Sequence, residues 1–401
     1  MEFSGTARGF LTCKVPIQAF ILTPVGNAKV RGYLPTLDGW RAIAVLSVVL
    51  HHDAPHSFGF LGTGWFQEHG SFGVDIFFGI SGLLICSRLL EEESKYGAIS
   101  LRRFYIRRGF RILPPLLGYL FVIGALAIGG VIAVDRKEWL ASLLFCRNYS
   151  FLGTVPGHAN WYTGHFWSLA VEEHFYFLLP GMLFLISRRW RIPSLVAVAV
   201  AVEIWRSYRL QTQPWQHLLQ HTDIRLDSLL IPAILAILIS KPGWHELLLK
   251  IVRFWPILFA LTIALVTLDR FEVVSKLVEP ILIPLFLLGT VVFPNSLAGR
   301  FLELPPLRWV GRLSYSLYLW QQLFVDGQFF APLGIWQSAP LNWLLLFGCS
   351  AGSYYLVERP LMNMGHRFAP PATPGRSDLE ESPQVSATVS DAPQTDVARR
   401  G

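Results

Sequence analysis

Long apolar stretches separated by short polar segments follow one another along most of the chain. A helix needs about 20 mainly apolar residues to cross the hydrocarbon layer of a membrane. The stretches that approach this length are 34–52, 72–90, 110–133, 166–187, 193–206, 225–240, 252–268, 278–293, 311–328 and 340–358. The fifth and sixth are short, and a tight RRWR turn divides the fourth from the fifth, so nine or eleven spans are alternatives. We predict an all-α fold, a polytopic membrane helix bundle of about ten transmembrane helices.

The composition agrees with this interpretation. Of 401 residues, 52% are hydrophobic and 15% are charged, and the mean hydropathy is +0.43, which is too apolar for a soluble globular protein of this size. The net charge of +7 comes from Lys and Arg between the apolar stretches, where basic residues act as topology signals. We therefore expect the lipid bilayer as a partner and no nucleic acid. The four cysteines lack the spacing of metal ligands, so we predict no metal site.

Basic residues also predict the orientation of the chain in the membrane. Residues 88–111 contain seven Lys and Arg, whereas residues 53–71 and 327–341 contain none. Because cytoplasmic loops are enriched in Lys and Arg, the first segment should be cytoplasmic and the other two external, and counting helices from there puts both termini in the cytoplasm. We expect a cytoplasmic N-terminal segment (1–33), a transmembrane domain (34–362) and a disordered cytoplasmic tail (363–401) rich in Pro, Ser, Thr and acidic residues.

Ionisable residues inside the apolar stretches are candidates for function, because charged groups in a membrane interior are costly. Arg41 and His52 lie eleven positions apart, which on a helix puts them on one face, roughly 16 Å apart along the axis. The alternative is an interfacial anchor with a histidine at the far end of the helix. Asp75, Glu172 and Glu173 lie toward the same external side, and a carboxylate among them could orient the imidazole. For Asp75, a helix N-terminal acid favoured by the helix dipole is an equal alternative.

A second charged group precedes the third span, in the sequence FYIRRGFRILPP. Arg108 and Arg111 are three positions apart and Arg107 and Arg111 are four apart, so a helix would present a cluster of guanidinium groups on one face. Planar guanidinium groups suit phosphate or pyrophosphate. The alternative is an anchor that contacts lipid headgroups on the cytoplasmic side. The sequence therefore predicts either a phosphate site or a topology signal at this place.

Ordered motifs along the chain resemble those of a known family. They are LDGWRAIAVLSVVLHH, GVDIFFGISGLLI, FYIRRGFRILPP, FWSLAVEEHFYFLLP, RLDSLL, GRLSYSLYLW and YYLVERPL. Together they resemble the acyltransferase 3 family of bacterial inner-membrane O-acyltransferases, over roughly residues 34–362. The resemblance implies about ten helices and transfer of an acyl group, often acetyl, from cytoplasmic acyl-CoA to a hydroxyl of an extracytoplasmic glycan, lipid-linked sugar or secreted small molecule. It implies acyl-CoA as a co-substrate and no permanently bound cofactor.

The resemblance also implies roles for single residues. His52 matches the catalytic histidine of the family and Arg41 its companion, while Arg108 and Arg111 match the motif that handles acyl-CoA. Glu172 matches the family glutamate. The terminal VERP motif falls on Glu358 and Arg359.

Three departures from the family pattern stand beside these matches. Gln321 occupies a position where members commonly have histidine, so the resemblance does not carry over a proton transfer assigned to that position. His174 stands where glutamine is usual. Many members carry a further esterase-like domain after the last helix, and we expect this chain to hand the acyl group directly to its acceptor.

These expectations combine into one mechanism with His52, Arg41, Asp75 and Glu172 as catalytic residues. The phosphates of acyl-CoA bind to the three arginines before the third span, and His52, oriented by Asp75 or Glu172, deprotonates the acceptor hydroxyl. Arg41 or a backbone donor stabilises the thioester oxyanion. A transient acyl-histidine or acyl-serine stays open. So do two other classes: a transporter or flippase of a glycan or lipid-linked intermediate, and a membrane glycosyltransferase acting on lipid-linked sugars.

Overall fold

The computed structural model describes residues 34–53, 64–149, 161–212, 218, 220–268, 272–325 and 332–370, and these residues form helices without a β-strand. The α-helices are α2 (Pro35–His52), α3 (Gly64–His69), α4 (Phe72–Tyr96), α5 (Leu101–Ile128), α6 (Arg136–Leu143), α7 (Trp161–Gly164), α8 (Phe166–Leu185), α9 (Arg191–Arg209), α11 (Thr222–Arg225), α12 (Asp227–Ile239), α13 (Pro242–Val252), α14 (Trp255–Thr267), α15 (Glu272–Val292), α16 (Leu297–Leu302), α17 (Pro305–Phe324), α18 (Leu341–Gly352) and α19 (Arg359–Phe368). The 3₁₀ helix η5 (Gly334–Gln337) and the π-helix η6 (Ser353–Glu358) complete the set. The predicted all-helical fold is confirmed for this part of the chain.

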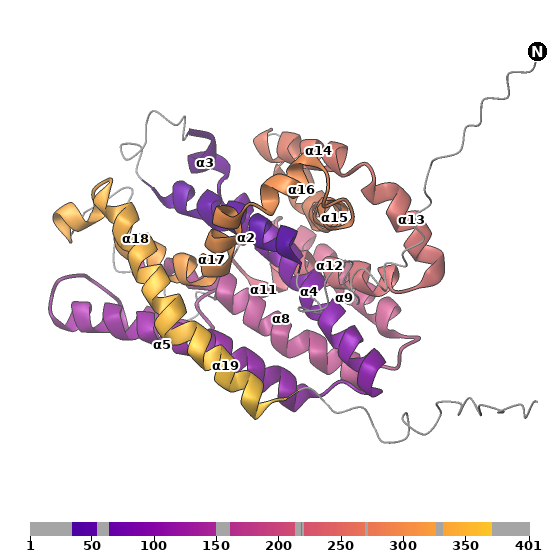
Figure 1. Ribbon diagram of the computed structural model, residues 1–401, viewed down its shortest axis with the longest axis horizontal. Coiled ribbons are helices and arrows are strands. Elements are labelled where there is room, and N and C mark those ends of the chain that lie inside the picture. The colour runs from indigo at the N-terminus through magenta and orange to yellow at the C-terminus, as the bar shows by residue number, and fades with distance from the viewer. Residues whose placement is uncertain are drawn as a thin grey trace, which may run out of the picture.

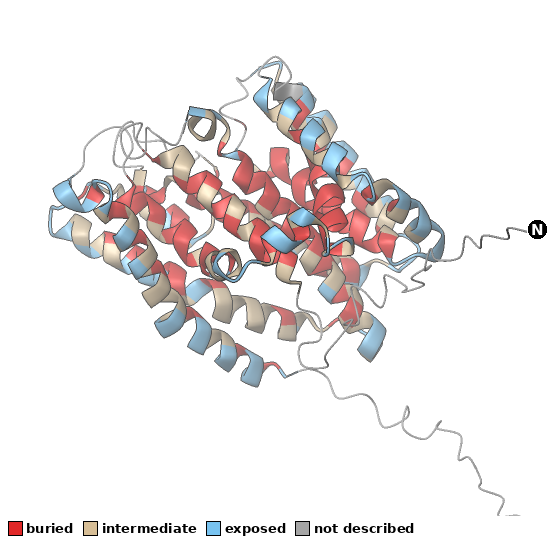
Figure 2. Ribbon diagram, turned by 45° about the horizontal axis from the view of Figure 1, so that its top comes forward, coloured by how far each residue is buried: buried red, intermediate tan, exposed pale blue. Residues whose placement is uncertain are grey.

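Helices from distant parts of the chain pack together at the centre of the molecule (Figure 1). Helix α2 packs against α17 on one side and α4 on another, and α12 and α15 pack on α4. Burial is concentrated in these central helices, as Figure 2 shows, and their buried side chains are mainly Leu, Ile, Val and Phe. Because α2 carries both Arg41 and His52, its central position surrounds these two residues with helices from both ends of the chain.

Glycines allow α2 to approach its neighbours closely. A Cβ atom added at Gly311 of α17 would overlap the carbonyl oxygen of Asp38 on α2, and one added at Gly73 of α4 would overlap the carbonyl oxygen of Ala44. Small residues permit this kind of close contact between helix backbones in membrane proteins. The two contacts fix the position of α2 between α4 and α17, and the side chains that α2 carries are fixed with it.

The outer helices expose large apolar side chains. On α5, Phe121 is 76% exposed and Ile128 is 92% exposed, and on α8 the corresponding values are 76% for Phe177 and 80% for Leu185. Soluble monomers rarely expose apolar surface of this extent, and such surface marks contact with a partner or a membrane. Together with the apolar interior, this exterior indicates a membrane protein.

Three of the described helices are long and apolar enough to cross a membrane: α4, α5 and residues Val274–Val292 of α15. A fourth crossing results if α12 and α13, which meet at a bend of 117°, form one broken span. Each stretch predicted from the sequence overlaps a helix, but the other helices fall short in length or in apolar character. The predicted number of about ten crossings is therefore not confirmed for the described residues.

Two boundaries differ from the prediction. Helix α5 begins at Leu101, so the arginine motif and the third apolar stretch lie on one continuous helix. At the other end of the chain, α18 continues through η6 into α19, and residues 363–368, predicted to be disordered, are helical. The physical reason is packing, because Phe368 of α19 stacks on Phe110 of α5 with ring centres 5.7 Å apart. Residues 1–33 and 371–401 lie outside the described residues.

Candidate functional site

A cavity of about 400 Å³ lies between α2, α4, α5, α8 and α17. The charged residues on its wall are Arg41, Arg88, Arg108, Arg111, Asp38, Glu172 and Glu173. We call it the arginine cavity. Four arginines face three acidic residues, so the wall carries an excess of positive charge. A cleft with this balance attracts anionic ligands.

The arginine motif of α5 divides between two faces of the helix. Arg108 and Arg111 line the arginine cavity, and the guanidinium carbon of Arg108 lies 4.7 Å from the centre of the Tyr176 ring. Arg107 instead forms an ion pair with Glu92 at 3.3 Å and is absent from the wall of this cavity. Consecutive helix residues point about 100° apart, which explains why one of the three predicted phosphate ligands faces elsewhere.

Glu172 also lies on the wall of the arginine cavity. Its Oε1 atom accepts a hydrogen bond from Ser81 Oγ at 2.8 Å, and its Oε2 atom accepts one from the Tyr176 hydroxyl at 3.2 Å. These donors hold the carboxylate in place beside Arg108, whose guanidinium group lies over the same tyrosine ring. Glu172 therefore belongs to the arginine cavity, and its hydrogen-bond partners differ from the expected pairing with His52.

Arg41 lies with the arginines of α5 and not with His52. Its Nη1 atom donates to Asp38 Oδ1 at 3.4 Å, one turn earlier on α2, and its side chain lines the arginine cavity. His52 lines a different cavity. This separation agrees with the roughly 16 Å that eleven residues span along a helix. Arg41 and His52 thus share one helix but contribute to two cavities.

The second cavity has a volume of about 840 Å³ and carries three histidines on its wall: His51, His52 and His165. We call it the histidine cavity. Its wall also contains Trp161, Tyr162, Trp167, Arg147, Gln220 and Gln322. Aromatic walls with a small number of polar groups are typical of ligand-binding pockets.

The hydrogen bonds around His52 determine which ring nitrogen carries the proton. Nδ1 of His52 lies 3.3 Å from Oε1 of Gln321, while Nε2 of Gln321 donates to the carbonyl oxygen of Tyr318 at 3.2 Å. An amide oxygen can only accept, so Nδ1 of the neutral imidazole is the donor and Nε2 keeps its lone pair. Gln321 thus orients the ring of His52, a role that the sequence analysis assigned to a carboxylate, Asp75 or Glu172.

The two cavities meet at Val74 and Tyr318, which belong to the walls of both. The Tyr318 hydroxyl donates to the backbone oxygen of His165 at 3.0 Å and lies 2.5 Å from Ser168 Oγ. These contacts hold the tyrosine ring at the boundary. A group that moves between the arginine cavity and His52 would pass this side chain.

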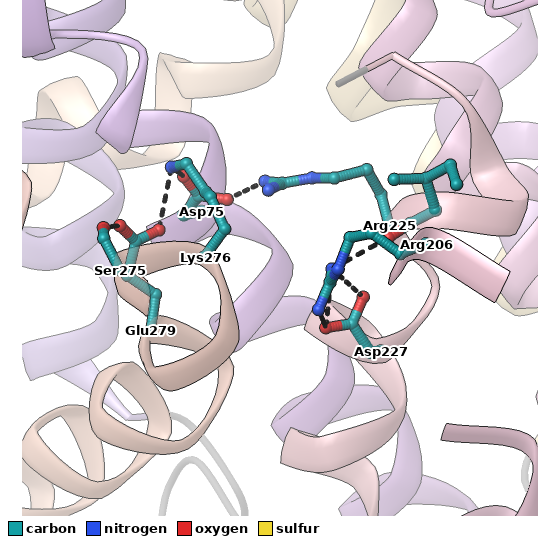
Figure 3. A network of polar contacts seen from close by, with 8 residues as sticks. Asp75, Arg206, Arg225, Asp227, Ser275, Lys276 and Glu279 are labelled. Carbon is teal, nitrogen blue, oxygen red and sulfur yellow. Dashed lines mark hydrogen bonds and ion pairs between the residues drawn. The ribbon is translucent and has the colours of Figure 1, made fainter. Parts of the chain in front are cut away.

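Asp75 belongs to a buried ion network (Figure 3). It is 5% exposed and forms ion pairs with Arg225 of α11 and with Lys276 of α15, whose Nζ lies 2.9 Å from Asp75 Oδ2. Lys276 also pairs with Glu279 at 2.9 Å. Both oxygens of Asp75 are therefore engaged by cations from distant helices, which differs from the expected contact with His52.

Sequence reasoning missed His165 and Gln322. His165 directly precedes α8 and is 2% exposed, and Gln322 on α17 is 3% exposed. Their side chains are hydrogen-bonded although the residues are 157 positions apart. A histidine before an apolar stretch is a weak signal by itself, and nothing in the spacing could have joined it to a glutamine so far along the chain.

Comparisons with known proteins agree with the motifs. The acyltransferase domain family matches residues 34–358. The O-acetyltransferase OatA of Staphylococcus aureus (strain NCTC 8325) is 28% identical over 368 residues, which cover 84% of this chain and 58% of OatA. A provisionally named O-acetyltransferase of Staphylococcus aureus (strain COL) is 29% identical over 369 residues, 83% of this chain and 58% of the relative.

The chain thus spans less than two thirds of these relatives, and no solved structure matches it. Because the family match covers most of its length, the chain belongs to the acyltransferase 3 family.

Proposed function

We propose that the protein is a membrane O-acyltransferase. It moves an acyl group, acetyl in the first instance, from cytoplasmic acyl-CoA to a hydroxyl group of a glycan, a lipid-linked sugar or a secreted small molecule. The observation that carries the proposal is the meeting of the arginine cavity and the histidine cavity at Val74 and Tyr318. One cavity suits a donor that carries phosphates, and the other suits base-catalysed attack by an alcohol.

Arg108 and Arg111, together with Arg41 and Arg88, are the proposed ligands of the CoA phosphates. Guanidinium groups bind phosphate through paired, charge-assisted hydrogen bonds. Arg108 rests on an aromatic ring, and within the described part of the chain the ion pairs at this end of α5 involve Arg103 and Arg107. A phosphate could therefore bind Arg108 and Arg111 without displacing a carboxylate from them.

His52 is the proposed general base. Its Nε2 atom accepts the proton of the acceptor hydroxyl, and the hydroxyl oxygen attacks the thioester carbonyl. The tetrahedral intermediate then loses CoA as a thiolate when the C–S bond breaks, which leaves the acyl group on the acceptor oxygen. The proton on Nε2 passes to the thiolate or to solvent. Gln321 accepts from Nδ1 throughout, so the ring keeps one orientation during the reaction.

We propose the bacterial inner membrane as the location, with about ten crossings and both termini in the cytoplasm. The support is the concentration of Lys and Arg in residues 88–111, the absence of both from residues 53–71, and the apolar exterior of α5 and α8. In this orientation the arginine motif of α5 lies on the cytoplasmic side, where acyl-CoA is available. His52, at the other end of α2, lies toward the external side.

The test uses the full-length protein in phospholipid vesicles with acetyl-CoA whose acetyl group is radiolabelled. The wild-type protein should release CoA, detected with a thiol reagent, and should transfer label to glycerol as a simple hydroxyl acceptor. His52→Asn should lower the rate of transfer about a hundredfold or more, because asparagine can donate near the Nδ1 position but has no Nε2 base. His366→Asn is the matched control, since His366 is exposed on α19.

Two results would contradict the proposal: no release of CoA by the wild-type protein, or full transfer by the His52→Asn variant. The same vesicles also test the alternative that the protein is a transporter, because they allow the movement of a lipid-linked sugar across the bilayer to be measured. Flux of a lipid-linked sugar across the bilayer that proceeds equally well without acetyl-CoA would favour a transporter over an acyltransferase.

A further inference from the structure

Two side chains line both the arginine cavity and the histidine cavity: Val74 of α4 and Tyr318 of α17. Both are buried, at 6% and 7% exposed. Arg108 and Arg111 belong to the wall of the first cavity, and His52 belongs to the wall of the second. The carbonyl group of a donor held by these arginines therefore has to reach the two shared side chains before a hydroxyl activated by His52 can attack it.

The ring of Tyr318 is held in one position at this boundary. Its hydroxyl donates to the backbone oxygen of His165 at 3.0 Å and lies 2.5 Å from Ser168 Oγ. The ring also packs edge to face with Phe77 of α4, with ring centres 6.4 Å apart. A turn of the ring away from the boundary would break these buried contacts, which is unfavourable. The tyrosine side of the boundary therefore resists displacement by a bulky group.

Val74 is constrained as well. Its branched side chain has one strongly preferred rotamer in a helix. The preceding residue, Gly73, lies so close to the carbonyl oxygen of Ala44 that a Cβ atom there would overlap it. This contact ties the turn of α4 that carries Val74 to α2, which carries His52. The valine side chain therefore keeps its position relative to the proposed base.

Two aromatic rings meet close to the same boundary. Phe78 of α4 lines the arginine cavity and Trp167 of α8 lines the histidine cavity. The rings pack edge to face, with centres 6.3 Å apart and planes at 89°. The side chains between the two cavities are thus mainly apolar and packed against one another. Sites packed in this way respond to the addition of a single methylene group.

We propose that Val74 and Tyr318 select the acyl group by its size, and that they admit acetyl and exclude longer acyl groups. The inference rests on the proposed function and deepens it, because it names the class of donor thioester and the residues that choose it. The methyl group of acetyl fits between the two side chains, so the carbonyl carbon can face His52. A longer chain would overlap one of them and would hold the carbonyl carbon away from the attacking hydroxyl.

The experiment compares acetyl-CoA with butyryl-CoA, whose acyl groups differ by two methylene groups. The full-length protein in phospholipid vesicles receives either thioester together with glycerol, and the glycerol ester is measured by mass spectrometry. The wild-type kcat/KM should be about a hundredfold higher for acetyl-CoA, because a methylene group that does not fit costs about tenfold or more. We call the quotient of the two kcat/KM values the acetyl preference.

Val74→Ala is the decisive variant, because it removes two methyl groups from the boundary and leaves the arginines and His52 unchanged. The acetyl preference should fall about tenfold or more. Val202→Ala on α9 is the matched control, since Val202 is 7% exposed and lines neither cavity. Its acetyl preference should stay within about twofold of the wild-type value.

Tyr318→Phe is the second variant, because it keeps the ring and removes the hydroxyl that anchors it. Its acetyl preference should fall about threefold, since the ring can then yield to a longer chain without breaking a hydrogen bond. Thermal unfolding shows which variants are folded. If Val74→Ala does not fold, the acetyl preference of Tyr318→Phe decides.

The outcomes separate this inference from the proposed function. No release of CoA from either thioester by the wild-type protein would refute the proposed function, and the inference with it. Equal use of both thioesters by the wild-type protein, or an unchanged acetyl preference in a folded Val74→Ala variant, would refute the inference alone. An equal loss of activity with both thioesters in that variant would also refute it, because Val74 would then support the site without contacting the acyl group.

Discussion

Gln321 is the residue whose role changed most between sequence and structure. In the sequence it stands where the resemblance to the family leads us to expect a histidine. In the structure its oxygen holds Nδ1 of His52, while the two carboxylates expected to do so are engaged by other groups, Glu172 by two hydroxyls and Asp75 by two cations. An uncharged acceptor is enough to define the tautomer of the imidazole.

Replacing Gln321 should therefore act through the orientation of His52. Gln321→Leu removes the acceptor, and we expect acetyl transfer to fall roughly tenfold, less than the loss of the base itself. Gln321→His, which offers a bare ring nitrogen at the same place, should keep most of the activity. The rate of CoA release from acetyl-CoA is the measurement, and equal rates for wild type and Gln321→Leu would contradict this role.

The two neighbouring arginines of α5 provide a matched pair. Arg108 lines the arginine cavity and Arg107 pairs with Glu92. Arg108→Ala should raise the KM for acetyl-CoA by about tenfold or more, because a charge-assisted hydrogen bond to phosphate contributes roughly 1.5–3 kcal/mol. Arg107→Ala should change this KM by less than about twofold, since Arg107 does not line the arginine cavity and pairs with Glu92 instead.

A steady-state titration of acetyl-CoA at saturating glycerol measures both KM values. The reverse order, with the larger effect at Arg107, would assign phosphate binding to the other face of α5. Spacing alone could not choose between these arginines, because Arg108 lies three and Arg107 four positions from Arg111, and both spacings put two side chains on one helix face. The choice depends on how α5 is rotated against α2 and α8.

At the scale of helices, the apolar stretches predicted the elements well, because a membrane helix needs a continuous apolar run. The ends were less predictable. Residues 363–368 look like the start of a polar tail, and they remain helical because Phe368 reaches Phe110 on α5. The π-helix η6 was not predictable either. It lies between α18 and α19 and ends at Glu358, which accepts a hydrogen bond from Ser316 of α17 at 3.1 Å.

The contact between α2 and α17 gives a prediction for stability. Gly311→Ala places a methyl group against the carbonyl oxygen of Asp38, so the helices have to separate. Overpacking of this kind costs about 1–3 kcal/mol, and the thermal unfolding temperature in detergent should fall. Gly118→Ala on α5 is the control, because a Cβ atom there meets nothing within 4 Å and alanine favours the helix.

Activity should fall together with stability in the Gly311→Ala variant, because α2 carries His52 and α17 carries Gln321. An unfolding temperature equal to that of the Gly118→Ala variant would show that the two helices can separate without cost. In that case the close crossing would not be what keeps His52 beside Gln321.

At the scale of the whole molecule, buried charges connect segments that are distant in the sequence. Arg225 and Lys276 both reach Asp75, and Arg206 of α9 pairs with Asp227 of α12 at 3.2 Å (Figure 3). The sequence indicated that ionisable residues inside apolar stretches have a purpose. It could not say which of them serve binding and which hold helices together, because the partners of Asp75 lie 150 and 201 positions away.

The network predicts that Asp75 is more important for folding than for chemistry. Asp75→Asn leaves two buried cations with one acid fewer, and removing one partner of a buried ion pair costs about 3–5 kcal/mol. We expect a lower unfolding temperature and a smaller yield of folded protein. The kcat per folded molecule should stay close to that of the wild type.

The double variant Asp75→Asn, Lys276→Gln tests the coupling. Its loss of stability should be smaller than the sum of the two single losses, because each single change leaves an uncompensated charge. If the Asp75→Asn variant folds normally but no longer transfers the acetyl group, Asp75 would instead be a catalytic residue, as the sequence analysis expected.

Helix α17 contributes Tyr318, Gln321 and Gln322, and these three side chains lie within little more than one helical turn. Tyr318 lies at the boundary between the cavities, and Gln321 and Gln322 are hydrogen-bonded to the rings of His52 and His165. All three positions therefore depend on how one helix, α17, is rotated about its axis. A small molecule that binds between α17 and α2 and rotates α17 would displace all three side chains at once. Such a compound would lower turnover without resembling either substrate, and raising the concentration of acyl-CoA or of the alcohol would not overcome it.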